Sequence, residues 1–278
     1  MFSILIPTWN NFLYLKTCIE SLQEHSGYNH QILVHVNEGK DESIAWLQEQ
    51  KISYTHSSEN IGICKALNLL AAKATAPYLV YMNDDMYALP QWDAALIKKI
   101  KAIGHENFYL SATMIEPTKG PFNCMIAPHF FGELNGNFNL AKLLDFHKHI
   151  SFDDWNGASW PPSLVSKANW DAVGGYSESF SPGLYSDPDF SMKLWQLGIR
   201  DFIGVGSSRV YHFQSKTLHR VKLNNGRKQF KRKWGISAAY FYKNYLKIGG
   251  AHQGSLPEIK KNFSHFWATI KAKLSAII

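Results

Sequence analysis

Two adjacent carboxylates follow a short apolar stretch in the first hundred residues. The stretch Tyr78–Met82 comes after Pro77 and leads into Asn83, Asp84 and Asp85. Five apolar or aromatic residues in a row predict a strand that is buried on both faces, as in the centre of a parallel sheet. Ligands of such sheets bind outside the carboxyl ends of the strands. Because two neighbouring acids repel each other, a divalent cation carried by a diphosphate is a ligand that would suit this strand end.

A polar turn is the alternative interpretation of these three residues. The surrounding pattern favours a binding edge, because expected strands at 3–8, 31–36 and 52–55 alternate with expected helices, the third of them capped by Asn60. This alternation predicts βαβ units and a parallel sheet, whose polar strand ends converge on one edge. Neither a GxGxxG nor a GxxxxGK[ST] loop is present, so neither a dinucleotide site nor a P-loop is indicated.

Beyond residue 105 the pattern is less regular. Strands are expected at 108–114, 163–166, 201–205 and 209–213, and helices at 141–149 and 169–173, with a loop at 117–137. Asp187 reads as the N-cap of a further helix, with Pro188 as its first residue. His212 ends the last expected strand, where a lone histidine is more often a packed residue than a ligand.

Charge is divided unevenly along the 278 residues. Residues 216–278 hold 14 Lys and Arg against one acid, a net charge of +13, whereas residues 1–215 hold 15 against 21, a net charge of −6. The three cysteines are far apart and form no CxxC pair, which favours a reducing compartment. No signal peptide or stretch of roughly 20 apolar residues is present. We therefore expect a cytoplasmic protein.

The basic C-terminal segment predicts an anionic partner surface. A basic run at 227–234 is followed by Ser255–Glu258, which has the spacing of a capping box for a final helix. One face of that helix would carry Ile259, Phe263, Phe266, Ile270, Leu274 and Ile277, with lysines towards the other. Two interpretations stay open: the helix lies on an anionic membrane at its inner face, or it packs its apolar face on the protein. No nucleic-acid reader motif is present, so we expect no nucleic-acid partner.

Six short motifs, taken in order, resemble those of the inverting family 2 glycosyltransferases, and the resemblance covers residues 3–215. They are Ile6-Pro7-Thr8-Trp9-Asn10, Glu59-Asn60-Ile61-Gly62 with Ala66-Leu67-Asn68, Asn83-Asp84-Asp85 leading into Leu89-Pro90-Gln91-Trp92, Gly174-Gly175-Tyr176 with Glu178, Ser186-Asp187-Pro188-Asp189-Phe190, and Val210-Tyr211-His212. No single motif is specific, and the order and spacing of the six carry the resemblance.

The resemblance implies an α/β protein with the GT-A fold, in which a Rossmann-like, mostly parallel central sheet is flanked by helices. Residues 1–215 would form the transferase domain, with a nucleotide-sugar-binding half at 1–104 and an acceptor-binding half at 105–215, and residues 216–278 a helical basic extension. The implied reaction is metal-dependent transfer of a sugar from a nucleotide-sugar, expected to be a UDP-sugar, to a hydroxyl of a glycan or lipid-linked acceptor, as in polysaccharide biosynthesis.

The family pattern also implies roles for single residues. Asp85 would hold Mn²⁺ or Mg²⁺ with His212 as a further ligand, and Asp187 matches the general base, kept ionised by the helix N-terminus. The donor would contact Pro7, Thr8, Asn10, Asn37, Glu38, Asn60, Gly62, Asn83 and Asp84. The acceptor would contact Trp160, Tyr185 and Asp189, of which Asp189 is also the next candidate for the base. Trp155 is a further aromatic candidate, although ordinary core packing is an equally good interpretation of each aromatic residue.

Three departures from the family pattern bear on function. Asn83 replaces the first acid of the metal motif, and Ser186 replaces the acid before Asp187. The position at which the family carries the acid that reads the nucleobase corresponds to Asn37 or Glu38. A catalytically silent glycan- or membrane-binding module on the same scaffold is therefore the alternative interpretation.

Overall fold

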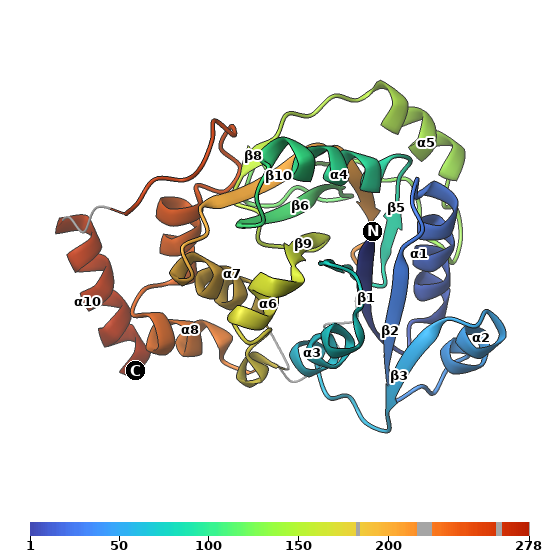
Figure 1. Cartoon of the computed structure of the whole chain (residues 1–278), viewed down its shortest axis with the longest axis horizontal. Coiled ribbons are helices and arrows are strands. Elements are labelled where there is room, and N and C mark those ends of the chain that lie inside the picture. The colour runs from blue at the N-terminus through green and yellow to red at the C-terminus, as the bar shows by residue number, and fades with distance from the viewer. Residues whose placement is uncertain (182–183, 216–223, 260–262, 278) are drawn as a thin grey trace.

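The computed structural model describes residues 1–181, 184–215, 224–259 and 263–277. Its strands form one twisted mixed sheet at the centre of the molecule, with β1 to β3 towards one side and α10 at the opposite end (Figure 1). The N-terminal half is built of β1 (Phe2–Trp9), α1 (Phe12–His25), β2 (Gln31–Asn37), α2 (Ser43–Glu49), β3 (Ser53–Ser57), α3 (Ile63–Lys73), β4 (Tyr78–Tyr81), β5 (Met86–Ala88) and α4 (Trp92–Ile103).

The second half contains longer irregular connections. Its elements are β6 (Phe108–Ile115), β7 (Met125–Ile126), α5 (Leu140–His149), β8 (Trp155–Asn156), β9 (Ser163–Ser166), α6 (Lys167–Ala172), the 3₁₀ turn η1 (Glu178–Phe180), α7 (Ser186–Gln196), β10 (Asp201–His212), α8 (Gly226–Trp234), α9 (Ala238–Tyr240), the π-helical turn η3 (Phe241–Leu246) and α10 (Phe263–Ile277).

The strand order is β3-β2-β1-β4-β9-β6-β10-β5. The first four strands are parallel, as predicted, whereas β9 lies antiparallel between β4 and β6. The two strands predicted at 201–205 and 209–213 are wrong as separate elements, since both belong to β10. The register of β10 against β6 shifts between Val205 and Arg209, so the intervening residues form an irregularity within one strand rather than a loop between two.

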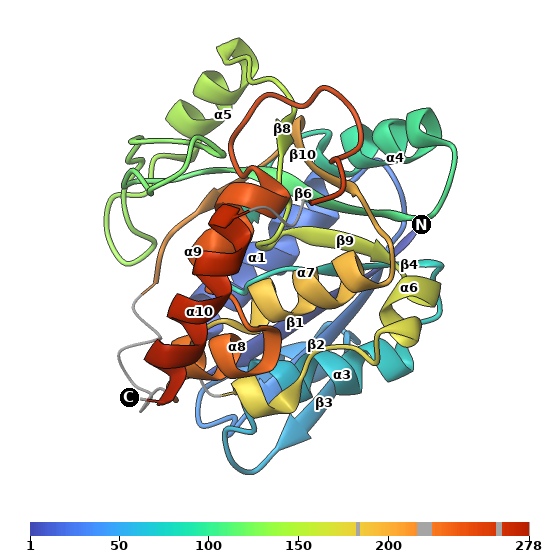
Figure 2. The same ribbon diagram turned by 90° about the vertical axis from the view of Figure 1, so that its left-hand side faces the viewer.

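Alternate residues of β1 explain why its sequence is apolar throughout. Ile4 and Ile6 belong to the core under α1 and α4, whereas Leu5 belongs to the core under α3 and α7. Because side chains alternate between the two faces of a strand, a strand covered on both faces must be apolar at every position. Figure 2 shows this arrangement from the side, with α3, α6 and α7 in front of the sheet and α1 behind it.

The C-terminal segment packs into the same core as α3 and α7. Phe230, Phe241 and Leu246 are fully buried there. The predicted capping box is wrong: residues 255–259 are not helical, and the Leu256 backbone N–H donates to the carbonyl of Arg200. The helix that the structure does describe there, α10, begins at Phe263, while residues 260–262 and the side chains of Phe263, Lys273 and Ile277 lie outside the described part. No helix among the described residues is long and apolar enough to cross a membrane.

Candidate active site

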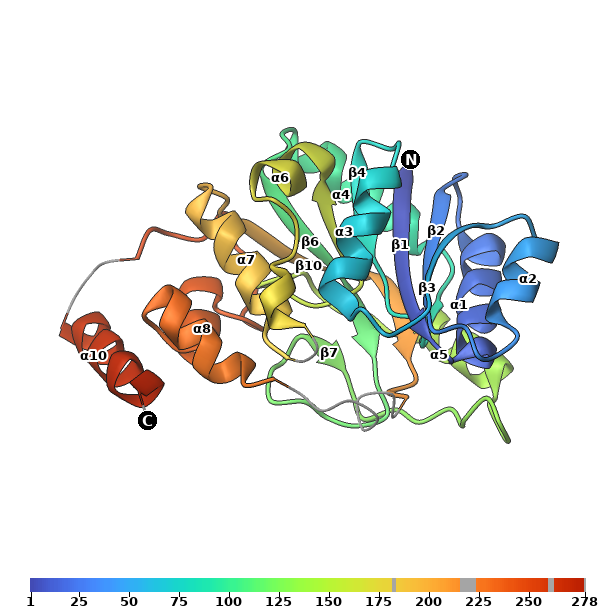
Figure 3. The same ribbon diagram turned by 90° about the horizontal axis from the view of Figure 1, so that it is seen from below.

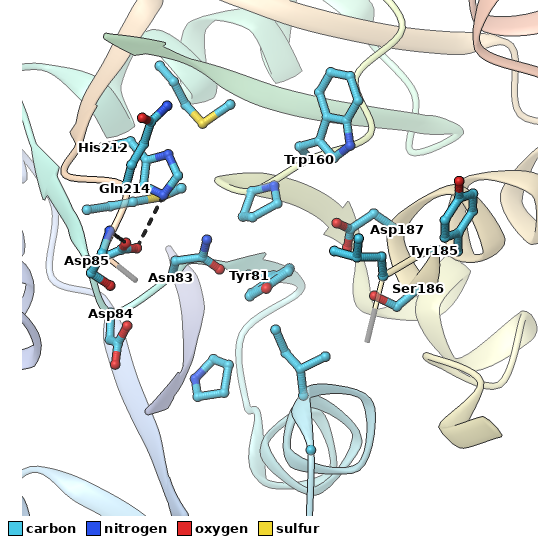
Figure 4. Close-up of a pocket in the computed structure, with 18 of the residues that line it drawn as sticks. Tyr81, Asn83, Asp84, Asp85, Trp160, Tyr185, Ser186, Asp187, His212 and Gln214 are labelled. Carbon is cyan, nitrogen blue, oxygen red and sulfur yellow. Dashed lines mark hydrogen bonds and ion pairs between the residues drawn. The ribbon is translucent and has the colours of Figure 1, made fainter. Parts of the chain in front are cut away.

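A cavity of about 940 Å³ opens at the carboxyl ends of β1 and β4, where ligands of open α/β sheets bind. One end is lined by Asp85, in the loop after β4, and by His212, the last residue of β10. The other end is lined by the first residues of α7, which include Asp187. Figure 4 shows the two groups on opposite sides, with Asn83 and Tyr81 between them. Acids from distant parts of the sequence therefore face one shared space.

The ends of β1 and β2 are tied to the acid pair by side-chain hydrogen bonds. The Thr8 hydroxyl donates to Asp84 Oδ2 at 2.6 Å. The Asn37 amide donates to the Thr8 carbonyl at 3.1 Å and accepts the Ile61 N–H at 2.9 Å. Thr8, Asn37 and Asp84 line the cavity, as predicted for donor-binding residues, together with Pro7 and Asn83. Asn37 thus braces three chain segments as well as facing the cavity.

The turn before α3 also lines the cavity through Asn60 and Gly62. The predicted N-cap role of Asn60 is wrong. Gly62 occupies the N-cap position with a positive φ of 77°, which glycine adopts without steric cost, and Asn60 Oδ1 accepts its N–H. Asn10 and Glu38 do not line the cavity: they hydrogen-bond each other, and Glu38 pairs with Lys40. The structure thus brings seven of the nine predicted donor residues to the cavity wall.

His212 lies between two carboxylates, those of Asp85 and Glu116. His212 Nε2 lies 3.4 Å from Asp85 Oδ1, and its Nδ1 lies 2.7 Å from Glu116 Oε1. Asp85 Oδ2 also accepts the Ser215 N–H at 2.8 Å. Burial alone would lower the pKa of His212, but Asp85 and Glu116 raise it to about 10. Burial raises the pKa of Asp85, but the charge of His212 and the hydrogen bonds from His212 and Ser215 together outweigh it, so that the pKa lies below its ordinary value.

This arrangement fits a divalent cation. Glu116 accepts the Nδ1 proton of His212, so Nε2 is the nitrogen that faces Asp85, and a cation would bind there in place of the Nε2 proton. Asp85 and His212 would be two protein ligands, and a cation of the magnesium type takes its remaining ligands from phosphates and water. Among the described residues, no group of three or more His, Cys, Asp and Glu side chains is arranged to hold a metal.

Asp187 is the second residue of α7, and the predicted N-cap role is wrong for it. Tyr185 occupies the N-cap position with left-handed backbone (φ 82°), so α7 begins at Ser186. The side chain of Asp187 instead lines the cavity and accepts a hydrogen bond from the Tyr176 hydroxyl at 3.2 Å. Burial raises the pKa of Asp187 to about 7, and the Tyr176 bond only partly opposes this. The expectation that the helix N-terminus keeps this acid well ionised is therefore wrong.

Asp189 does not line the cavity, although we predicted it as an acceptor contact. Its fully buried carboxylate accepts hydrogen bonds from Ser177 at 2.6 Å and from Trp234 Nε1 at 2.7 Å, and Lys233 lies 2.8 Å away. Lys233 and Trp234 belong to α8. Asp189 therefore ties α8 to α7, and the structure gives it neither an acceptor contact nor the position of a base.

Aromatic side chains line the same cavity as Asp187. Trp160 and Tyr185, which we predict as acceptor contacts, both line it. Trp160 packs against Tyr242 and Phe122, with ring centroids 5.2 and 5.7 Å apart. Trp155 is a core residue instead, because its indole N–H donates to the buried Thr113 hydroxyl. Apolar rings beside a half-buried acid form a surface on which a sugar ring or lipid tail can pack.

Glu116 and Tyr242 are among the residues of the site that the sequence did not predict. Glu116 follows β6 directly, and β6 lies parallel to β10 with Ile115 paired to Tyr211, so Glu116 and His212 are neighbours. The rule that polar strand ends meet could have found Glu116. Tyr242 lines the cavity from η3, together with Ala238 and Ala239 of the preceding turn. No local sequence signal marks it, because its place depends on how the C-terminal segment packs.

A mostly parallel α/β sheet with an acid pair at one strand end and a third acid across the cavity is the arrangement of the GT-A class of transferase folds. The sequence model of glycosyl transferase family 2 matches residues 3–154, more than half of the chain. The chain belongs to this family, as the motifs indicated, and it is a glycosyltransferase by family. A search of curated proteins finds no match.

Solved structures similar to this chain include those of TarS from S. aureus. TarS 1-349 in complex with UDP-GlcNAc has a TM-score of 0.59 at 14% identity, covering 88% of this chain and 67% of that chain. TarS 1-349 in complex with UDP has a TM-score of 0.57 at 13% identity, covering 99% and 80%. The match covers 60% of TarS 1-349 in a further structure and 40% of a longer TarS chain. These likenesses confirm the predicted GT-A fold.

Proposed function

We propose that this protein is an inverting glycosyltransferase that moves a sugar from a UDP-sugar to a hydroxyl of a glycan or lipid-linked acceptor. The observation that carries the proposal is the placement of Asp187 and Asp85 on opposite sides of one cavity. Direct displacement at the anomeric carbon needs a base on one side of the sugar and charge stabilisation for the leaving diphosphate on the other. A product of inverted anomeric configuration, identified by NMR, tests this proposal.

The residues at each end divide the chemistry between them. Asp187, with its pKa raised to about 7, is matched to accept the proton of the acceptor hydroxyl near neutral pH. Thr8, Asn37, Asn60 and Gly62 would position the nucleoside. A divalent cation bound by Asp85 and His212 would supply a Lewis acid for the departing diphosphate.

The silent-module interpretation makes a different prediction about the purified protein. A transferase with a complete donor site and base releases UDP slowly from a UDP-sugar even when water is the only acceptor. A binding module releases none. UDP release measured with Mn²⁺ and with a chelator separates the two interpretations, and no release from any UDP-sugar that binds would contradict our proposal.

Replacing Glu116 by Gln should weaken metal binding without removing a ligand. The carboxylate holds Nδ1 of His212 at 2.7 Å, and loss of such a partner typically lowers metal affinity about 10- to 100-fold. We expect calorimetry to show this drop in Mn²⁺-dependent UDP affinity, with UDP affinity in chelator unchanged. Glu49→Gln, at an exposed acid at the end of α2, is the matched control. If the Mn²⁺ dependence of UDP binding is unchanged in Glu116→Gln, Glu116 does not orient His212 for a metal.

Transfer activity should rise with pH through about 7, since Asp187 must be ionised to accept a proton. A carboxyl at the ordinary value of 3.8 would give a flat profile over the neutral range. We expect kcat/KM to fall about tenfold for each pH unit below the pKa, measured at saturating Mn²⁺. A profile that is flat from about pH 5 to 8 would show that the base has an ordinary carboxyl pKa. That result would contradict the assignment of Asp187 as the base.

A further inference from the structure

Helix α10 contacts the rest of the protein through its small and polar side. Ala272 and Ala276 are buried. Lys231 of α8 donates to the Ser275 hydroxyl at 2.8 Å, and Arg232 of α8 donates to the Ala276 carbonyl at 3.1 Å. Figure 3 shows α10 at the end of the molecule, with α8 on its inner side. The side of α10 that faces the protein is therefore not its apolar side.

Three large apolar side chains of α10 are exposed. Phe266, Trp267 and Leu274 are 57%, 54% and 61% exposed. At 3.6 residues per turn, Trp267 and Leu274 lie on the side of the helix opposite Ala272 and Ala276, and Phe266 lies at the edge of that side. No other helix in the described part of the chain carries more than one large hydrophobic side chain this exposed. For Phe266 and Leu274, two members of the predicted apolar face, the structure thus does not show packing on the protein, whereas Ile259 of the same predicted face does pack against the core.

Positive charge lies beside this exposed stripe. Lys271 of α10 is exposed, and so is Arg227 of α8, which shares a surface hollow with Ser275 of α10. The only acid of residues 216–278 is Glu258, and it is paired with Arg200 at 2.7 Å. An apolar helix face bordered by cations is the pattern of a helix that lies in a lipid interface, where tryptophan also prefers to sit. Anionic headgroups would attract the cations over a short range.

We propose that α10 lies in the plane of an anionic lipid surface, with Phe266, Trp267 and Leu274 inserted below the headgroups and with Lys271 and Arg227 at headgroup level. The same C-terminal segment lines the cavity through Ala238, Ala239 and Tyr242. If the proposed function holds, docking would bring the acceptor end of the cavity towards a lipid-linked acceptor. The docking itself does not depend on that function.

Vesicle flotation tests the proposal with a matched pair of triple variants. Phe266→Ser/Trp267→Ser/Leu274→Ser removes the stripe, and Leu13→Ser/Leu69→Ser/Leu197→Ser removes three leucines that are 40%, 41% and 45% exposed elsewhere. We expect the parent and the control to bind vesicles of phosphatidylcholine with phosphatidylglycerol, and to bind more weakly to phosphatidylcholine alone or at high salt. The stripe variant should lose at least about tenfold in binding.

Folding and oligomeric state are measured for the same variants. Circular dichroism and the unfolding midpoint check that the stripe variant is folded, and if it is not, Trp267→Ser alone takes its place. Equal vesicle binding by the parent and the folded variant would overturn the proposal. So would absence of parent binding to anionic vesicles. Light scattering that finds a parent dimer and a monomeric variant, with no vesicle binding, would show that a second copy covers the stripe instead.

Discussion

An Asp187→Asn variant is expected to fold and bind UDP as the parent does, but to turn over at least about a hundredfold more slowly. Asparagine keeps the shape of the side chain and can still accept the Tyr176 hydroxyl bond at Oδ1, but it cannot accept a proton from the acceptor hydroxyl. An N-cap role of Asp187 cannot account for such a loss, because Tyr185 occupies the N-cap position of α7.

Stability measurements supply the control for this variant. Burial raises the pKa of Asp187 in the folded protein, so the proton is held more tightly than in the unfolded chain. The stability that this provides is present below the unfolded pKa and is lost as pH rises through about 7. Asp187→Asn should therefore unfold at pH 8 with the same free energy as the parent or a higher one. If Asp187→Asn turns over within a few-fold of the parent, Asp187 is not the base.

The N-terminal half of the fold could be predicted because its signals are local. Each strand there is a short apolar run buried on both faces, as Ile4, Leu5 and Ile6 illustrate. Parallel strands bring their polar ends to one edge, which is why Thr8, Asn37 and Asp85 meet at the cavity. That rule needs only the order of the elements, and the sequence contains that order.

The rest of the site depends on packing between distant segments. The apolar pattern of Ser163–Ser166 predicts a strand but not its antiparallel place between β4 and β6. The pattern Asp-Pro-Asp suggests a helix start, yet the left-handed Tyr185 moves that start and leaves Asp187 facing the cavity. Asp189 looked equally available in the sequence, but its partners Lys233 and Trp234 come from α8. Such roles are set by tertiary contacts that no short window of sequence contains.

An Asp85→Asn variant is expected to lose the Mn²⁺-dependent part of its UDP affinity. Asparagine can still accept the Ser215 N–H that Asp85 Oδ2 accepts at 2.8 Å, so the local fold should be kept. The change removes the negative charge that would hold a cation, and with it the counter-charge that raises the pKa of His212. The loss of a charged ligand should exceed the about 10- to 100-fold effect of losing a hydrogen-bond partner such as Glu116.

The measurement is calorimetric titration of UDP with Mn²⁺ and with a chelator, for the parent, Asp85→Asn, Asp85→Ala and Asp145→Ala. Asp145 lies on α5 with a side chain that is 75% exposed, so its replacement controls for loss of one surface acid. We expect Asp85→Asn and Asp85→Ala to bind UDP equally in Mn²⁺ and chelator, and Asp145→Ala to behave as the parent. The two Asp85 variants separate charge from backbone support: if only Asp85→Ala loses affinity, the Ser215 contact matters and the metal does not. Full Mn²⁺ dependence in both variants would remove the metal site from this strand end.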